Sequence, residues 1–259
     1  RLDELPGIVQ AYRDAARRAI EAGFDGIEVH GANGYLLDQF LRRGSNHRTD
    51  AYGGPIGHRA RLLLEVMRAV CDEIGADRVG LRLSPVTAAN DAQDDDQQPL
   101  FEHVVRQLAP LGLAYLHLIE GQTGGARDFQ QGPAPFDYAA LRQAYRDAGG
   151  RAAWMVNNGY DAALAQQALD GGAVLLAAFD AQVGFALFFG QQAGLGFLDG
   201  GQDRCLACFI FVDTYAEIDL VTTGIVFEGF GQTKNRVGGR SLDNLEHGGS
   251  SLGAKRPVA

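Results

Sequence analysis

The sequence predicts an α/β fold of the (β/α)₈ barrel type. Apolar runs of strand length alternate with amphipathic runs of helix length between residues 6 and 179, and parallel strands need crossover helices of this kind. An open doubly wound sheet fits the alternation equally well. The strand ends favour the barrel, because several carry a polar residue and the carboxyl ends of barrel strands share one face. These polar residues are His30, Arg82, Glu120 and Asn157.

Short apolar runs bounded by glycine, proline or polar residues predict the strands. In chain order they are 26–30, 78–83, 114–120, 152–157 and 173–179. Helices are predicted where apolar residues recur three and four positions apart, and Gly23 ends the first of them. In chain order they are 6–22, 34–42, 58–74, 100–108, 138–148 and 161–169. The polar run 90–98, which contains Asp94, Asp95 and Asp96, is expected to be a solvated loop.

The composition of the 259-residue chain is that of a soluble globular protein, with 46% hydrophobic and 21% charged residues. No stripe of Lys and Arg accompanies the net charge of -9, so we expect no nucleic-acid partner. No apolar run approaches the roughly 18 residues of a membrane span, and the start is not a signal peptide. We therefore expect no membrane partner. The three cysteines make no disulfide framework, so we expect the protein in the reducing cytoplasm. Because the chain does not begin with Met, we expect a fragment or a processed chain.

The segment from His30 to Leu41 carries the residues best suited to chemistry, at the point where a predicted strand becomes a loop. His30 and Asn33 can both donate to one oxygen, and Tyr35 adds a phenol that can deliver a proton. Two donors on a carbonyl oxygen stabilise the negative charge of an enolate, as in an oxyanion hole. The alternative is that this His and Asn satisfy the backbone of the loop.

Several motifs, in their order and spacing over about residues 5–172, resemble the Old Yellow Enzyme family. The match includes His-Gly-Ala-Asn-Gly-Tyr-Leu at 30–36, Gln-Phe-Leu at 39–41, Ser-Asn-His-Arg-Thr-Asp-Ala-Tyr-Gly-Gly at 45–54, Arg-Val-Gly-Leu-Arg-Leu-Ser-Pro at 78–85, Tyr-Leu-His at 115–117 and Asn-Gly-Tyr-Asp at 158–161. Gly57 and His58 stand where that family usually has Glu and Asn.

The resemblance implies a flavin enzyme on a (β/α)₈ barrel, of which this chain matches the later five β/α units. FMN would be the cofactor and NAD(P)H the reductant, with hydride passing through the flavin to an enone or a related nitro or nitrate ester compound. In that case His30 and Asn33 hold the activating oxygen of the small-molecule substrate, and Tyr35 supplies a proton. No HxH or paired-carboxylate cluster stands at the strand ends, so we expect no metal site. The resemblance leaves the substrate, the choice between NADH and NADPH and the oligomeric state open.

The resemblance also assigns residues to the cofactor. Arg82 would lie beside the flavin ring, where a fixed guanidinium stabilises the negative charge of the reduced form. Asn158 and Gly159 match the loop whose backbone N–H groups meet the FMN phosphate.

Two departures from the family set an alternative against this function. The family has an Arg that binds the phosphate after the last strand, whereas this chain continues from Phe179 into Asp180. A lost charge-assisted contact would weaken FMN binding by about ten- to a hundred-fold. The first three strands of the barrel are not upstream of the matched part, and five strands do not close a barrel. The alternative is an incomplete or degenerate barrel without flavin binding or catalysis.

Residues 1–179 are accordingly expected to be the later part of a flavin-binding barrel, and 180–259 an unassigned segment. Its three apolar runs, 183–189, 205–212 and 218–227, are read either as strands that complete the barrel in permuted order or as part of an unrelated, partly disordered segment. Cys205 and Cys208 form a CxxC pair that is too small for an iron–sulfur cluster, so we expect ordinary burial of these thiols.

Overall fold

The computed structural model describes residues 1–131 and 134–171 in full and, beyond them, only the backbone of five short strands. The helices are α1 (Leu5–Glu21), α2 (Leu36–Leu41), α3 (Ile56–Arg59), α4 (Arg61–Ile74), α5 (Gln97–Leu108), α6 (Tyr138–Asp147) and α7 (Ala162–Asp170), with 3₁₀ turns at Leu2–Glu4, Ala76–Arg78 and Ala109–Leu111. The strands are β1 (Gly26–Gly31), β2 (Val79–Leu83), β3 (Tyr115–Ile119), β4 (Ala153–Asn157), β5 (Leu176–Ala178), β6 (Leu187–Phe189), β7 (Phe209–Val212), β8 (Arg236–Val237) and β9 (Arg240–Ser241).

The predicted alternation of strands and helices is confirmed, with ends that differ by a few residues. Local chemistry explains several of these ends. Pro6 stands in the first turn of α1, where a missing N–H costs nothing. Asp137 and Asp161 cap α6 and α7, because their carboxylates accept from the backbone N–H groups of Ala140 and Leu164 at 2.8 Å.

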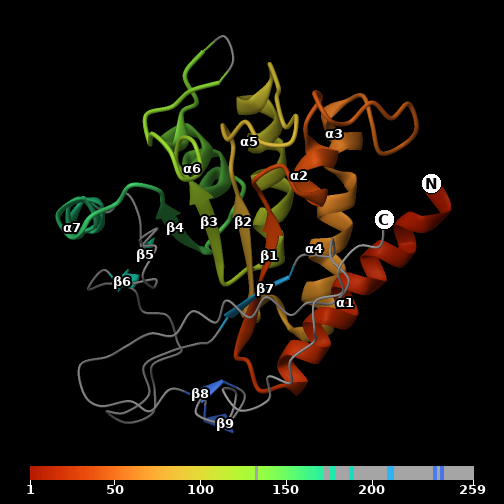
Figure 1. The fold of residues 1–259 in the computed structure, drawn as a ribbon, viewed down its shortest axis with the longest axis horizontal. Helices are drawn as coiled ribbons and strands as arrows, with labels where there is room; N and C mark the ends of the chain where they lie inside the picture. Colours follow the sequence, from red (N-terminus) through yellow and green to blue (C-terminus); the bar gives the residue numbers. More distant parts are fainter. Residues whose placement is uncertain are drawn as a thin grey trace, which may run out of the picture.

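The strands form an open sheet in the order β6-β5-β4-β3-β2-β1-β7 (Figure 1). β1 to β5 are parallel to one another, as the β/α repeats predict. β7 adds a parallel strand beside β1, whereas β6 pairs antiparallel with β5. Among the described strands the barrel is therefore not closed, and the strand within 183–189 does not run in the direction that a parallel barrel wall requires.

The hydrophobic core lies between the sheet and its helices. Alternate residues of the strands point toward the helices, and they include Ile27 of β1, Leu81 of β2 and Trp154 of β4. α1 and α4 pack against each other beside β1 and β2 (Figure 1). The other face of the same strands is left for polar residues, which form the candidate site.

The structure corrects two expectations, and a third group lies outside the described residues. The helix expected at 58–74 is two helices, α3 and α4, that meet at Ala60. The run 90–98 is not a solvated loop throughout, because Asp94 is only 8% exposed and Gln97 already begins α5. The expectations for Cys205, Cys208 and the run 218–227 lie outside the described residues.

Candidate active site

A row of polar side chains crosses three neighbouring strands on the face opposite the helices. Glu28 and His30 alternate with apolar residues along β1, so both belong to this face. The parallel register places His30 beside Arg82 of β2 and Arg82 beside His117 of β3. The row lies toward the carboxyl ends of the strands, where the sequence placed the site.

His30 and Tyr35 lie together at one end of this row. Their ring centroids are 5.3 Å apart, with an angle of 50° between the ring planes. His30 is 8% exposed and Tyr35 is 45% exposed. The imidazole is thus held inside the protein while much of the phenol remains accessible, which suits a buried donor and a solvent-facing proton donor.

Asn33 lies in the loop between β1 and α2 and is held at both its backbone and its side chain. Its φ of 60° is in the left-handed region, where Asn is more common than most residues. Its backbone N–H donates to Ser84 Oγ at 2.7 Å. Its side-chain Oδ1 accepts from Thr123 Oγ1 at 2.7 Å. Because the acceptor end of the amide is engaged, the amide presents its donor, Nδ2, on the other side.

Gly34 follows Asn33 and explains why this loop needs a glycine. Its φ is 70°, and a Cβ at this position would lie 2.1 Å from the carbonyl oxygen of Ala89. The two loops therefore touch through their backbones. The N–H of Gly34 donates to Asp38 Oδ2 at 2.9 Å, so the buried Asp38 holds the loop from the first turn of α2.

A buried pair of Glu28 and His117 lies beside Arg82. Glu28 Oε2 and His117 Nδ1 are 2.9 Å apart, and the two residues are 1% and 2% exposed. Burial by itself raises the pKa of the Glu28 carboxyl, but the charge and hydrogen bond of His117, together with Arg82, hold that pKa below its usual value. Burial and the charge of Glu28 raise the pKa of Tyr115 on β3. The polar row thus includes a buried carboxylate whose neighbours favour its ionised form.

Asn158 and Gly159 form a turn directly after β4. Their φ values are 91° and 68°, so two consecutive residues take the left-handed region. The Asn158 side chain donates to the backbone carbonyl groups of Glu120 and Gln122. The Asn158 side chain therefore ties this turn to the loop after β3. Because that side chain is engaged, the turn can offer its backbone to a ligand.

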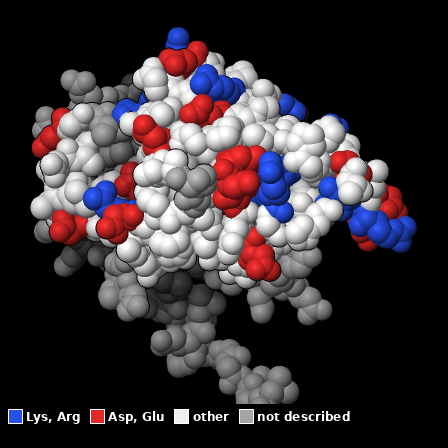
Figure 2. Space-filling model, turned by 90° about the horizontal axis from the view of Figure 1, so that it is seen from above, with Lys and Arg blue, Asp and Glu red and all other residues white. Residues whose placement is uncertain are grey.

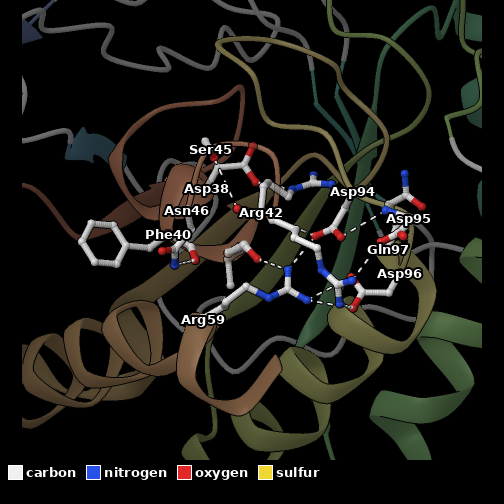
Figure 3. A network of polar contacts seen from close by, with 12 residues as sticks. Asp38, Phe40, Arg42, Ser45, Asn46, Arg59, Asp94, Asp95, Asp96 and Gln97 are labelled. Carbon is white, nitrogen blue, oxygen red and sulfur yellow. Dashed lines mark hydrogen bonds and ion pairs between the residues drawn. The ribbon is translucent and has the colours of Figure 1, made fainter. Parts of the chain in front are cut away.

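Figure 3 shows the charged network that holds the loops around α2. Arg42 donates to Asp38 at 2.8 Å and to the backbone carbonyl groups of Ser84 and Pro85 at 2.6 and 2.8 Å. The side chains of Arg42 and Asp38 are fully buried. This arginine thus fixes the end of β2 against α2, on the side where Asn33 contacts Ser84.

Arg59 is the second centre of that network (Figure 3). It contacts Asp94 at 2.6 Å and Asp96 at 2.8 Å, and the side chains of Arg59 and Asp94 are both fully buried. Burial raises the pKa of Asp94, but its hydrogen bond with Asp96 and the charge of Arg59 hold that pKa below its usual value. Burial and Asp94 raise the pKa of Asp96. The carboxylates of this run, including Asp95, lie close together, but the first and third already face a cation.

The surface above the strand ends mixes charges of both signs. Figure 2 views this side and shows Arg side chains interspersed with Asp and Glu around a broad area of other residues. Among the helices of residues 1–131 and 134–171, none combines the length and the apolar character that a membrane-spanning helix needs.

The structure brings together most of the residues that the sequence singled out. His30, Asn33 and Tyr35 lie around one loop, with Arg82 next to His30 in the sheet. Sequence reasoning missed Thr123, because its partner is 90 residues away and no local motif marks it. The pair of Glu28 with His117 left a signal, since a polar residue in a buried strand must find a partner.

Comparisons with known proteins agree with this geometry. The model of the NADH:flavin oxidoreductase / NADH oxidase family matches residues 2–177. A putative 12-oxophytodienoate reductase 5 from Oryza sativa subsp. japonica is 49% identical over 154 residues, which cover 58% of this chain and 41% of that protein. A probable flavin mononucleotide-dependent alkene reductase from Leishmania infantum is 52% identical over 119 residues, which cover 46% of this chain and 33% of that protein.

A solved structure extends the likeness to three dimensions. The old yellow enzyme homologue from Zymomonas mobilis matches with a TM-score of 0.60 and 37% identity, over 67% of this chain and 47% of that one. The chain spans less than half the length of each of these relatives. The matches confirm the barrel-type fold class and the resemblance that the motifs indicated.

Proposed function

The chain belongs to the NADH:flavin oxidoreductase / NADH oxidase family, and from this premise we propose that it acts in an FMN-dependent oxidoreductase that uses NAD(P)H to reduce activated alkenes. Enones and related nitro or nitrate ester compounds are the proposed substrates. With this function we propose that residues 1–179 are the later part of the flavin-binding barrel and that the protein works in the cytoplasm. The role of 180–259 stays a prediction.

Two places on the described chain fit FMN. Arg82 supplies a partly exposed cation in the polar row, where it can stabilise the negative charge of a reduced flavin ring. A Cβ at Gly159 would make only an ordinary van der Waals contact, with Arg127 Cβ at 3.7 Å, so the turn is not crowded. Backbone N–H groups in turns of this kind bind anions, so the turn at Asn158 and Gly159 suits a phosphate.

When bound, FMN supplies the hydride chemistry, taking two electrons from NAD(P)H and delivering them to the alkene. The chain's own residues bind and polarise the substrate. His30 and Asn33 are proposed to donate to the carbonyl or nitro oxygen that activates the double bond, as an oxyanion hole does. Tyr35 is proposed to give the proton that completes the reduction, because its phenol is accessible and adjacent to His30.

The observation that carries this proposal is the orientation of the Asn33 amide. The hydroxyl of Thr123 occupies the oxygen of that amide, so its N–H₂ group is the part left to meet a ligand. An amide placed only to satisfy the loop backbone, the alternative from the sequence, would direct this donor at a carbonyl group of the loop. A fixed donor beside a buried histidine is what an electron-rich oxygen of a substrate requires.

The visible absorption spectrum of the purified full chain tests the function. We expect a flavin band that persists after FMN is added and the protein is desalted, at about one FMN per chain, followed by NAD(P)H oxidation that depends on a simple enone. A protein that stays colourless after this treatment would show that the chemistry of His30, Asn33 and Tyr35 does not operate in this chain. The incomplete-barrel alternative would then take its place.

A further inference from the structure

The turn at Asn158 and Gly159 has a cationic neighbour that the sequence motifs did not indicate. The chain has Phe179 and Asp180 where the resemblance calls for an Arg that binds the phosphate. Arg127, from the loop between β3 and α6, lies against the turn, with its Cβ 3.7 Å from the position of a Cβ on Gly159. A positive charge is thus present at the turn, although it comes from a different loop.

The backbone of the loop holds Arg127 in this place. The N–H of Gln122 donates to the carbonyl of Ala126 at 3.0 Å and closes a short turn. Gly121 has φ 72°, and a Cβ there would lie 2.3 Å from the carbonyl oxygen of Arg127. The glycine therefore lets the returning chain pass directly over the start of the loop, which brings Arg127 back to the end of β4.

Side chains then join the loop to the residues after β4. The guanidinium of Arg127 lies 5.2 Å from the ring centroid of Tyr160 and donates to Glu120 Oε2 at 3.1 Å. Tyr160 donates to the same carboxylate oxygen at 2.9 Å. Asn158 donates to two carbonyl groups of the loop. The side chain of Arg127 nevertheless stays 41% exposed, so part of its guanidinium is accessible.

We propose that Arg127 is the cation that binds the phosphate of FMN in this chain, in place of the Arg that is absent after Phe179. The inference rests on the proposed function and adds a residue to it. A guanidinium offers five donors, of which Glu120 and the hydroxyl of Tyr160 engage some, so others are left for phosphate oxygens. The aromatic face of Tyr160 limits the positions that the guanidinium can take.

The negative charge of Glu120 would repel the phosphate of FMN. Removing that charge should therefore change FMN binding in the direction opposite to removing Arg127. The carboxylate of Glu120 contacts Arg127 and is only 16% exposed, so it cancels part of the charge that the phosphate would meet. Glu120→Gln keeps an oxygen for the hydroxyl of Tyr160 and removes the negative charge. We expect this variant to bind FMN a few times more tightly than the wild-type chain does.

The experiment compares FMN with riboflavin, which has the same ring without the phosphate. Dissociation constants are measured by quenching of flavin fluorescence with the full-length chain. Arg127→Ala should weaken FMN binding about ten-fold, as expected for a lost charge-assisted contact, and leave riboflavin binding unchanged. Arg127→Lys should recover part of the loss. Arg106→Ala is the matched control, since Arg106 is 46% exposed and pairs with Glu102 on α5, away from the turn.

The outcomes separate this inference from the function on which it rests. If Arg127→Ala binds FMN as the wild type does, or loses FMN and riboflavin equally, Arg127 does not contact the phosphate and the proposed function stands. If the wild-type chain binds neither flavin, both the function and the role of Arg127 are overturned. Weaker FMN binding in Glu120→Gln would likewise overturn the role assigned to Arg127.

Discussion

The hydroxyl of Thr123 donates to the side-chain oxygen of Asn33 across 2.7 Å, and this contact joins the loop after β3 to the loop after β1. Thr123 Oγ1 also lies 2.9 Å from Thr87 Oγ1 in the loop after β2. Three consecutive strand ends are therefore connected through two threonine hydroxyls. The amide that we propose to bind substrate is therefore positioned by residues that need not touch the substrate.

The first prediction concerns that contact. Thr123→Val keeps the shape of the side chain but cannot donate to Asn33, so the amide loses the bond that orients it. We expect binding of a phenol, which resembles an enolate oxygen, to weaken about five-fold in the flavin-loaded protein, equivalent to roughly 1 kcal/mol. A spectral titration of the flavin band measures it. Thr123→Ser retains the hydroxyl and should bind the phenol as the wild type does, and equal binding by all three proteins would contradict the role of Thr123.

The second prediction concerns the contact between the two loops at Gly34. Gly34→Ala places a Cβ in the left-handed region and against the carbonyl oxygen of Ala89, so we expect a loss of about 2–4 kcal/mol in the free energy of unfolding. Gly54 has φ 80° with no atom within 4 Å of a Cβ, and Gly54→Ala should cost only about 1–2 kcal/mol. Urea denaturation compares the two variants. An equal loss would show that the clash with Ala89 is absent in solution.

The third prediction concerns the buried ion pair of Asp94 with Arg59. Asp94→Asn removes one of the two carboxylates that face the buried Arg59, and we expect the free energy of unfolding to fall by about 3 kcal/mol. Asp95 is the neighbouring control, because its side chain is 71% exposed. Asp95→Asn should change stability by less than about 0.5 kcal/mol. If thermal and urea unfolding of the two variants coincide, the Arg59 pair does not stabilise the protein.

Asp94 was expected in a solvated loop but is buried, and it shows what the sequence alone cannot predict. The strands and helices depend on periodicity that is written locally, which is why β1 to β4 and the helices between them could be predicted. His30 and Arg82 could also be chosen as site candidates, because they belong to motifs whose order matches the family. The burial of Asp94 depends on Arg59, which lies 35 residues earlier, and no local pattern distinguishes such an aspartate from a solvated one.

Long-range pairing limited the prediction of the site in the same way. The structure connects Asn33 to Thr123 and Gly159 to Arg127 through loops that are far apart in sequence. Only the arrangement of the parallel strands brings these loops to one edge of the sheet. A sequence can therefore name the donors at the strand ends but not the residues that orient them.

The fourth prediction concerns pH. Burial raises the pKa of Glu28, but the charge and hydrogen bond of His117 outweigh burial and hold that pKa below its ordinary value of 4.5. The contribution of Glu28 to stability is therefore fully present above that value and is lost as the pH falls through the lower folded pKa. Glu28→Gln should be less stable than the wild type at pH 6, and the difference should shrink as the pH falls below about 4.5. Circular dichroism melts at several pH values measure this, and a constant difference would exclude an ionised Glu28.

The fifth prediction separates proton donation from substrate binding. Tyr35, the proposed proton donor, is accessible and adjacent to the buried ring of His30. That proposed role belongs to the reduction of the alkene and not to the reaction of the flavin with NAD(P)H. In Tyr35→Phe we expect enone reduction to slow by about 10²-fold or more, whereas reduction of the bound flavin by NAD(P)H should change little. Stopped-flow absorption of the flavin band follows the two half-reactions separately.

The matched variant for Tyr35 is Tyr52→Phe. The hydroxyl of Tyr52 contacts Glu65 at 2.9 Å, so this change removes a phenol hydroxyl whose partner lies on α4, away from the polar row. It should leave both half-reactions intact. If Tyr35→Phe slows both half-reactions equally, Tyr35 supports the architecture of the site instead of donating a proton. In that case the proton must come from another group or from water, because the reduced alkene still requires one at its α-carbon.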